Sequence, residues 1–176
     1  RYLYELPWYV VIGQPGAGKS SVLLNSGLRF PLADQMGAVR FSIDDWMTRL
    51  FWMDSPKPIE FEWTIERIAR CEAQIRDLVA ALAGQGMASV LDLGFTKADH
   101  RAEFADFAKT LGTSAKLHWI DVPEEQRWAR VVQRNSQRGP TYAMDVDRAM
   151  FDFMEREWEP PSAAELEMLA GQVIRA

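Results

Sequence analysis

Short apolar segments alternate with longer amphipathic segments along the whole chain. The apolar segments predict five strands, over residues 8–12, 38–43, 87–94, 115–122 and 172–176. Apolar residues that recur every three or four positions predict a long helix from Ile59 to Ala83, ended by Gly84. Further helices are expected over residues 20–27, 44–53, 97–112, 123–136, 145–157 and 162–170. Strands that alternate with helices predict an α/β fold, a mostly parallel sheet in a three-layer αβα sandwich.

A glycine-rich motif follows the first predicted strand. Residues 13–20, Gly-Gln-Pro-Gly-Ala-Gly-Lys-Ser, match the phosphate-binding pattern G-x-x-x-x-G-K-[ST] between a strand and a helix. In that setting, backbone N–H groups and the helix N-terminus face an anion, Lys19 reaches the outer phosphates, and the Ser20 hydroxyl joins the Mg²⁺ shell. The nucleotide-binding residues predicted here are Gly13, Gln14, Pro15, Gly16, Ala17, Gly18, Lys19, Ser20 and Ser21. The motif therefore predicts a P-loop NTPase fold that binds ATP and Mg²⁺.

Carboxylates follow the next two predicted strands, where ligands bind in parallel sheets. Asp44 and Asp45 come directly after the strand at 38–43, and either can accept a proton from an attacking hydroxyl. The alternative for this pair is a helix N-cap, a position that favours Asp. Asp92 near the end of the third strand is expected to order Mg²⁺ or to hold substrate, with a turn residue as the alternative.

Four arginines lie on the helix predicted over 123–136 and at its exit. Arg127 is expected on a solvated basic face. Arg130, Arg134 and Arg138 are spaced by four and share another face. Because Arg134 and Arg138 lie next to Gly139, they are predicted to belong to a helical lid and to steady the transferring phosphoryl group.

Length and composition limit the number of domains, the partners and the location expected for this protein. A length of 176 residues suits one domain, 1–176, and the net charge of −5 argues against broad nucleic-acid binding. The single cysteine, Cys71, excludes an intrachain disulfide and is consistent with a reducing compartment. No apolar run of about 18 residues and no signal peptide are present, so a cytoplasmic location without membrane partners is expected. His100 and His118 lack metal-ligand spacing and are expected to be structural or exposed.

Residues 41–158 resemble P-loop small-molecule kinases of the AAA kinase-like group, which includes polynucleotide kinase and is related to zeta-toxin kinases. The resemblance rests on "SIDDW", "VLDLGFTKADHR", "IDVPEEQRW" and "VVQRNSQRGPTYAMDVDRAMFDFM". It implies that Asp44 is the catalytic base, that Asp92 is a substrate-side acid, and that Arg134 and Arg138 contact ATP phosphates. Polynucleotide-specific members have an arginine three residues after the base, where this chain has Met47. That difference favours a small hydroxyl acceptor over a 5′-hydroxyl oligonucleotide.

Residues 1–37 resemble a different family, the IcmF-like inner-membrane proteins of type VI secretion. The matching text includes "LPWYVVIG" and "LLNSGLRFPL". In both families this segment is a strand, a P-loop and a helix, so a chimera joined near Gly37 keeps the expected fold.

The leading hypothesis is therefore an ATP:hydroxyl phosphotransferase. A non-catalytic or weakly hydrolytic nucleotide-binding module is the alternative, and a chimera without a selected function is a third. The Asp44, Arg134 and Arg138 set separates the first from the others, because simple binding does not need these residues. The absence of an N-K-x-D motif favours ATP over GTP.

Overall fold

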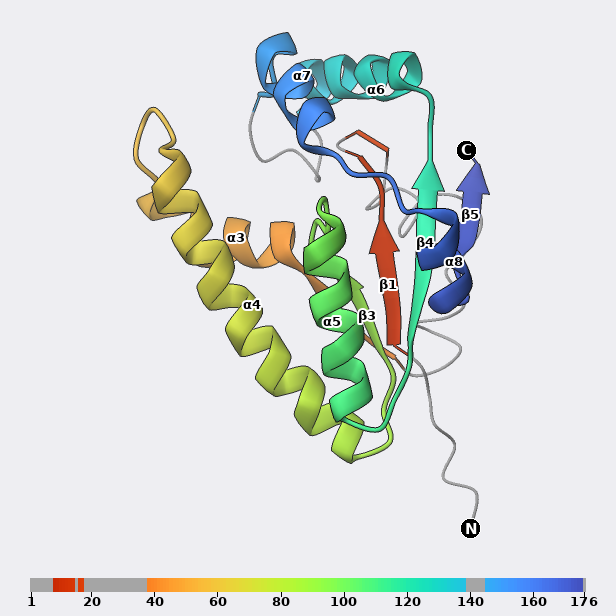
Figure 1. Ribbon diagram of the computed structural model, residues 1–176. Helices are drawn as coiled ribbons and strands as arrows, with labels where there is room; N and C mark the ends of the chain where they lie inside the picture. The colour runs from red at the N-terminus through yellow and green to blue at the C-terminus, as the bar shows by residue number, and fades with distance from the viewer. Residues whose placement is uncertain (1–7, 15, 18–37, 139–144, 176) are drawn as a thin grey trace.

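The structure is a computed structural model that describes residues 8–14, 16–17, 38–138 and 145–175 (Figure 1). Its strands form one five-stranded sheet in the order β2-β3-β1-β4-β5, and every pairing is parallel. The strands are β1 (Trp8–Ile12), β2 (Val39–Ser42), β3 (Ser89–Asp92), β4 (Ala115–Asp121) and β5 (Gln172–Arg175). All five lie within the segments predicted as strands, so the predicted α/β fold with a parallel sheet is confirmed.

The strand register brings the carboxyl ends together at one edge of the sheet. Ser42 at the end of β2 is opposite Asp92 at the end of β3, and Ile12 at the end of β1 is opposite Trp119 of β4. Residues that follow β1, β2 and β3 therefore lie along a common edge, where parallel sheets bind their ligands.

The described helices match the predicted ones in order and approximate length. They are α3 (Ile43–Phe51), the 3₁₀ turn η1 (Trp52–Asp54), α4 (Phe61–Gly84), α5 (Ala98–Thr110), α6 (Glu124–Gln137), α7 (Arg148–Glu157) and α8 (Ala163–Met168). Gly84 is still helical, and the chain turns at Gly86, whose φ of +70° suits glycine. The helix expected at 20–27 lies outside the described residues.

Alternate residues of β1 belong to two separate buried clusters. Val10 and Ile12 pack in the larger cluster with residues of α4 and α5, such as Ile75 and Phe104. Val11 belongs to the second cluster, on the other side of the strand. This period of two and the burial of all five β1 residues indicate a central strand covered on both faces.

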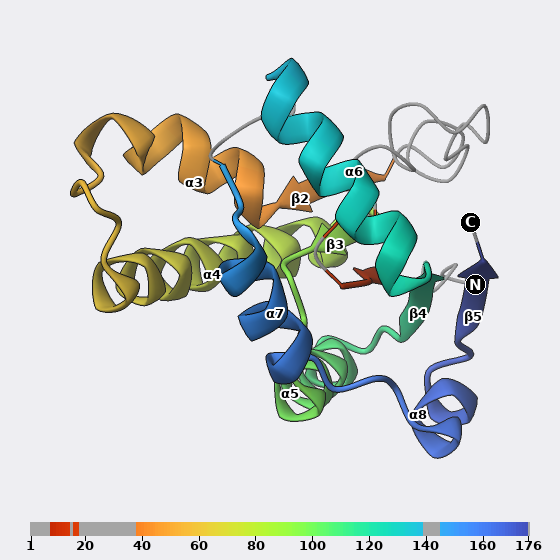
Figure 2. The same ribbon diagram turned by 90° about the horizontal axis from the view of Figure 1, so that it is seen from above.

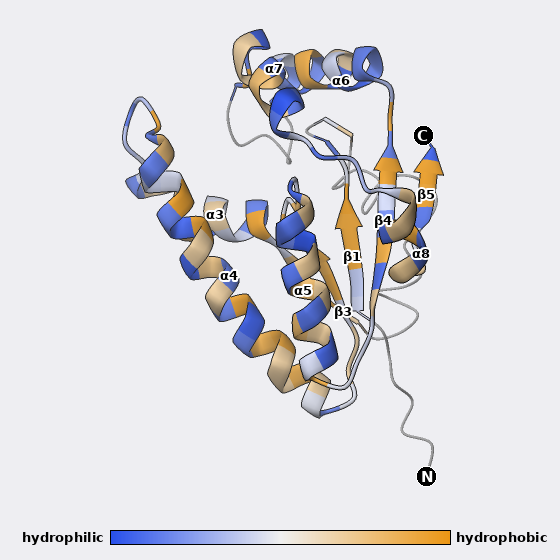
Figure 3. Cartoon of the chain, viewed as in Figure 1, coloured by the Kyte–Doolittle hydropathy of each residue, from blue (hydrophilic) through white to orange (hydrophobic). Residues whose placement is uncertain are grey.

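Helices α4 and α5 lie against the same face of the sheet, whereas α6 and α7 lie beyond its carboxyl edge (Figures 1 and 2). The latter pair therefore occupies the place expected of a helical lid. The strands are mostly hydrophobic and the helices mix hydrophobic with hydrophilic residues (Figure 3), as expected for a sheet covered by amphipathic helices. Within the described part of the chain, no helix is long and apolar enough to cross a membrane.

Arg101, a buried arginine of α5, binds residues of the C-terminal segment. The guanidinium of Arg101 pairs with Glu165 of α8 over 2.5 and 2.9 Å, and it also donates to the carbonyl oxygens of Phe95 and Glu159. A buried charge is tolerated when it is paired and hydrogen-bonded in this way. The sequence analysis assigned no role to Arg101, because its partner lies far away in the chain.

Candidate functional site

The described part of the phosphate loop contains two glycines that no larger residue could replace without movement. A Cβ on Gly13 would lie 3.0 Å from the carbonyl oxygen of Ile120 in β4. Gly16 has a φ of +76°, and a Cβ there would lie 2.8 Å from the carbonyl oxygen of Arg127 and 2.9 Å from Val131 Cγ2. The loop is therefore seated closely between the end of β4 and α6, as a glycine-rich phosphate cradle requires.

Two side chains from the helices hold the same loop. Arg130 Nη1 donates to the carbonyl oxygen of Ala17 over 3.0 Å. Gln14 Nε2 donates to Glu155 Oε2 of α7 over 3.2 Å. Within the loop, the Ala17 N–H donates to the carbonyl oxygen of Gln14 over 3.0 Å. The loop residues Gln14, Gly16 and Ala17 are thus brought into direct contact with α6 and α7.

The prediction that Arg127 lies on a solvated face is wrong. Its side chain is only 3% exposed, and it forms a bidentate ion pair with Glu155. Its Nε also donates to the carbonyl oxygen of Val122 over 2.8 Å. Arg127 lies four residues before Val131, so both are on the buried side of α6. The charge is tolerated there because Glu155 compensates it.

The structure places Arg134 and Arg138 at the far end of α6. Arg134 is partly buried, and among the described residues its Nε has no hydrogen-bond partner. Arg138 ends the helix in a left-handed conformation, with φ of 46°, and its exposed side chain pairs with Asp145 over 3.3 Å. A buried donor without a partner is suited to an incoming anion, whereas the Arg138 pair must open or be shared for Arg138 to reach one.

Ser42, and not an aspartate, caps α3. Its hydroxyl accepts from the N–H of Asp45, so Asp44 and Asp45 lie in the first helical turn. The N-cap alternative for these two residues is therefore wrong. Both aspartates are exposed at the carboxyl edge of the sheet, and their charges are favoured there by the helix dipole.

Arg40 joins two of the three predicted carboxylates. Its guanidinium lies 3.1 Å from Asp92 Oδ2 and 3.6 Å from Asp45 Oδ2. Asp92 is only 4% exposed, which makes the shorter contact the more important one. Sequence analysis missed Arg40, although a charged residue inside the apolar strand "AVRFSI" was a usable signal.

The described residues suit the phosphates of ATP, but they do not by themselves form a complete metal site. The cradle around Gly16 and the Arg134 Nε, which has no hydrogen-bond partner among the described residues, suit phosphate oxygens. Among the described residues, no group of three or more His, Cys, Asp or Glu could hold a metal. The Asp92 carboxylate is buried and paired with Arg40, so it is expected to reach Mg²⁺ only through water, which this ion usually retains. Residues Pro15, Gly18, Lys19, Ser20 and Ser21 lie outside the described residues, so their assignments stay predictions.

Both histidines are placed in structural surroundings. His100 contacts the rings of Phe95 and Phe104, with ring centroids 4.9 and 5.3 Å away, and its Nε2 lies 3.3 Å from Glu72 Oε2. His118 is buried in β4. Burial lowers the pKa of His118 below its ordinary value of 6.5, and the charge of Lys116 lowers it further.

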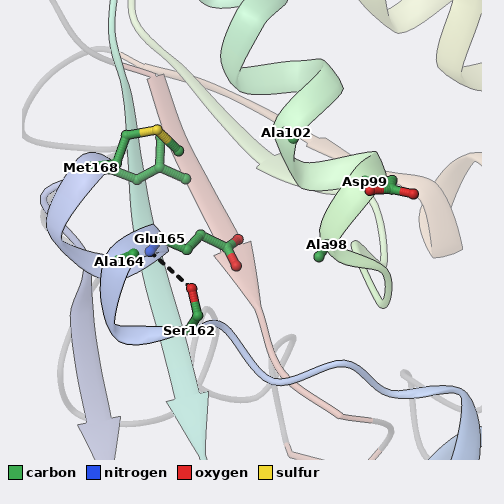
Figure 4. Close-up of a pocket in the computed structure, with 8 residues that line it drawn as sticks. Ala98, Asp99, Ala102, Ser162, Ala164, Glu165 and Met168 are labelled. Atoms are coloured by element: carbon green, nitrogen blue, oxygen red, sulfur yellow. Dashed lines mark hydrogen bonds between the residues drawn. The ribbon is translucent and has the colours of Figure 1, made fainter.

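A separate cavity of about 330 Å³ lies between α5 and α8 (Figure 4). Its lining comes from Ala98, Asp99, Ala102, Ser162, Ala164, Glu165, Met168 and Leu169. None of the predicted site residues is among them, and Glu165 is already bound to Arg101. This cavity is therefore separate from the predicted site residues that the structure describes.

Comparisons with known structures identify the same architecture. Gluconokinase from Sinorhizobium meliloti 1021 is similar with a TM-score of 0.63 at 16% identity, over 97% of this chain and 83% of that chain. Kti12 from Chaetomium thermophilum, solved in complex with ADP-AlF3, is similar with a TM-score of 0.68 at 20% identity, over 96% and 89% of the two chains. These likenesses confirm the P-loop kinase-like fold.

Sequence comparison finds similarity to two different kinds of protein, as the two resemblances predicted. Type VI secretion system component TssM1 from Pseudomonas aeruginosa is 74% identical over 38 residues, which are 22% of this chain and 4% of that protein. The model of the AAA domain family matches residues 9–161. Since that match spans most of the sequence, the chain belongs to the AAA domain family.

Proposed function

We propose that the chain transfers the γ-phosphoryl group of ATP to a hydroxyl of a small molecule. The observation that carries the proposal is the seating of the phosphate loop: Gly16 lies against the Arg127 carbonyl, and Arg130 holds the Ala17 carbonyl. The same helix carries Arg134 and Arg138. One element thus connects the phosphate cradle with the cations proposed to balance the charge of phosphoryl transfer.

The proposed nucleotide site consists of the loop and α6. Backbone N–H groups of the loop and Lys19 bind the phosphates, and Arg134 and Arg138 stabilise the charge on the transferring group. Ser20 and, through water, Asp92 hold Mg²⁺, which neutralises phosphate charge and orients the phosphates when it is bound. The Nε of Arg134 supports this role, because it has no hydrogen-bond partner in the part of the chain that the structure describes and a phosphate oxygen would give it an acceptor.

Asp44 is the proposed general base. Asp45 is engaged by Arg40 over 3.6 Å, whereas Asp44 has no ion-pair partner among the residues that the structure describes. A carboxylate that no guanidinium engages keeps both oxygens available to accept a bond from a hydroxyl. The acceptor hydroxyl is expected at the first turn of α3, beside Asp44.

A small acceptor is proposed over a polynucleotide. Met47 stands where polynucleotide-specific relatives have an arginine, and the net charge of −5 does not favour a polyanion. Gluconokinase, one of the similar structures, is named for a small sugar acid. A 5′-hydroxyl oligonucleotide belongs in the test as the competing acceptor.

A nucleotide-binding module without transfer is the second candidate. The 74% identity to TssM1 over 38 residues favours it, because the phosphate-binding segment then derives from a secretion component. That match agrees with a chimera of two families, which we propose for this chain. The two candidates differ in whether a phosphorylated acceptor is formed.

Phosphoryl transfer from ATP labelled in the γ-position, measured with Mg²⁺ and a panel of acceptors, tests the proposal. The panel holds sugars, sugar acids, nucleosides, hydroxyl-bearing antibiotics and a 5′-hydroxyl oligonucleotide, with Lys19→Ala as the control. A labelled product that disappears in Lys19→Ala supports a kinase. Saturable ATP binding without any labelled product supports the binding module instead.

A further inference from the structure

Glu155 contacts both the phosphate loop, through Gln14, and the buried guanidinium of Arg127. Its two carboxylate oxygens pair with the two terminal nitrogens of Arg127, and Oε2 also accepts from Gln14 Nε2 over 3.2 Å. Glu155 belongs to α7, Arg127 to α6 and Gln14 to the loop after β1. The carboxylate therefore joins three elements that are far apart in the sequence.

This carboxylate is held in place and is not a free surface group. The side chain of Arg127 is 3% exposed and that of Glu155 is 16% exposed. The Arg127 Nε is fixed by the Val122 carbonyl oxygen over 2.8 Å. A bidentate pair between a buried guanidinium and a partly buried carboxylate fixes the orientation of both partners, so Gln14 meets an acceptor whose position is set in advance.

The loop is held in place at three of its described residues. Gln14 is tied to Glu155, Gly16 is seated on the Arg127 carbonyl, and the Ala17 carbonyl is held by Arg130. Phosphate binding by backbone N–H groups depends on those groups converging before the ligand arrives. The hydrogen bond between Gln14 and Glu155 restricts the loop at a residue that precedes, in the sequence, the backbone N–H groups expected to bind the anion.

We propose that Glu155 is a positioning residue for phosphate binding, which acts through the side chain of Gln14. The inference rests on the proposed nucleotide site, and it adds a residue that lies 141 positions from Gln14. Glu155 carries negative charge, so it does not bind phosphate itself. It keeps the loop in the shape that binds phosphate.

The alternative is that Glu155 only joins α6 to α7. An exposed pair, Arg148 of α7 with Glu124 of α6 over 2.8 Å, joins the same two helices without touching the loop. Glu124→Gln is therefore the matched control. Gln14→Leu removes the tie and leaves the Arg127 pair intact, whereas Glu155→Gln weakens both contacts.

The experiment measures ADP affinity by calorimetry and the midpoint of thermal unfolding without nucleotide, for the full chain and each variant. Gln14→Leu is expected to bind ADP about tenfold more weakly, because the ligand must then order the loop itself, and to lower the midpoint less than Glu155→Gln, because the Arg127 pair stays intact. Glu155→Gln is expected to lose at least as much affinity, whereas Glu124→Gln keeps the affinity of the parent.

Two results overturn the inference, and they are distinguishable. If the parent chain binds ADP and Gln14→Leu binds it equally well, the positioning role of Glu155 is wrong and the nucleotide site stands. If the parent chain itself binds no ADP, the proposed function fails and this inference fails with it.

Discussion

Arg40 on β2 donates to the buried carboxylate of Asp92 at the end of β3, with 3.1 Å between Nη2 and Oδ2. The contact connects neighbouring strands at the edge where the proposed chemistry takes place. It also compensates the charge of Asp92, one of the three carboxylates predicted for the site. The guanidinium therefore helps to decide which carboxylate is available as a base.

Removal of Arg40 is expected to destabilise the fold. Arg40→Met leaves the buried Asp92 carboxylate without the guanidinium, at a cost of about 2 kcal/mol in the free energy of unfolding. Urea denaturation measures this change. Arg49→Met, at an exposed position in the last turn of α3, is the control and is expected to change stability by less than about 0.5 kcal/mol. Equal stability of the two variants would contradict the role given to the Arg40–Asp92 pair.

A methyl group at Gly16 is expected to disturb the phosphate loop. The added Cβ would lie 2.8 Å from the Arg127 carbonyl oxygen, and the φ of +76° strains any residue with a side chain. Gly16→Ala should therefore lower ADP affinity by at least tenfold, measured by calorimetry. Gly84→Ala, where nothing lies within 4 Å of the added methyl group, should leave affinity unchanged. Normal ADP binding by Gly16→Ala would show that the loop is not seated as described.

His118 is expected to make the fold less stable in acid. Burial, and then the charge of Lys116, lower the pKa of this side chain in the folded state. The unfolded chain therefore takes up a proton near pH 6.5 while the folded chain does not. Stability should fall as the pH decreases below 6.5 toward the folded pKa, by up to about 1.4 kcal/mol per pH unit.

The comparison of His118→Gln with the parent chain isolates this effect. The difference between their unfolding free energies, measured from pH 7.5 to pH 5, should change with pH below 6.5 because only the parent carries the titrating imidazole. His100→Gln serves as the control, and it should keep the acid-side loss that His118 causes. A pH-independent difference between His118→Gln and the parent would refute the assignment.

The strands and their common edge could be predicted from sequence because they depend on local pattern. The run "WYVVI" is apolar at every position, and the structure buries all five residues as a central strand. The same reasoning placed Asp44, Asp45 and Asp92 at the carboxyl edge, since parallel strands end on one side.

What the sequence could not show depends on partners far along the chain. Arg127 looked like a surface residue because its compensating carboxylate, Glu155, lies 28 positions later. A helix cap was the alternative for the aspartate pair, but Ser42, directly before α3, occupies that position. In each case, tertiary contact and not local preference determined the role of the residue.

The most direct test of the account compares Asp44→Asn with the parent chain, using whichever acceptor the panel identifies. Substitution of the base should reduce phosphoryl transfer at least about a hundredfold, as for loss of a general base. ADP affinity should stay unchanged, because Asp44 does not contact the nucleotide in the proposed site. Transfer at the parental rate by Asp44→Asn would show that the proposed base is wrong.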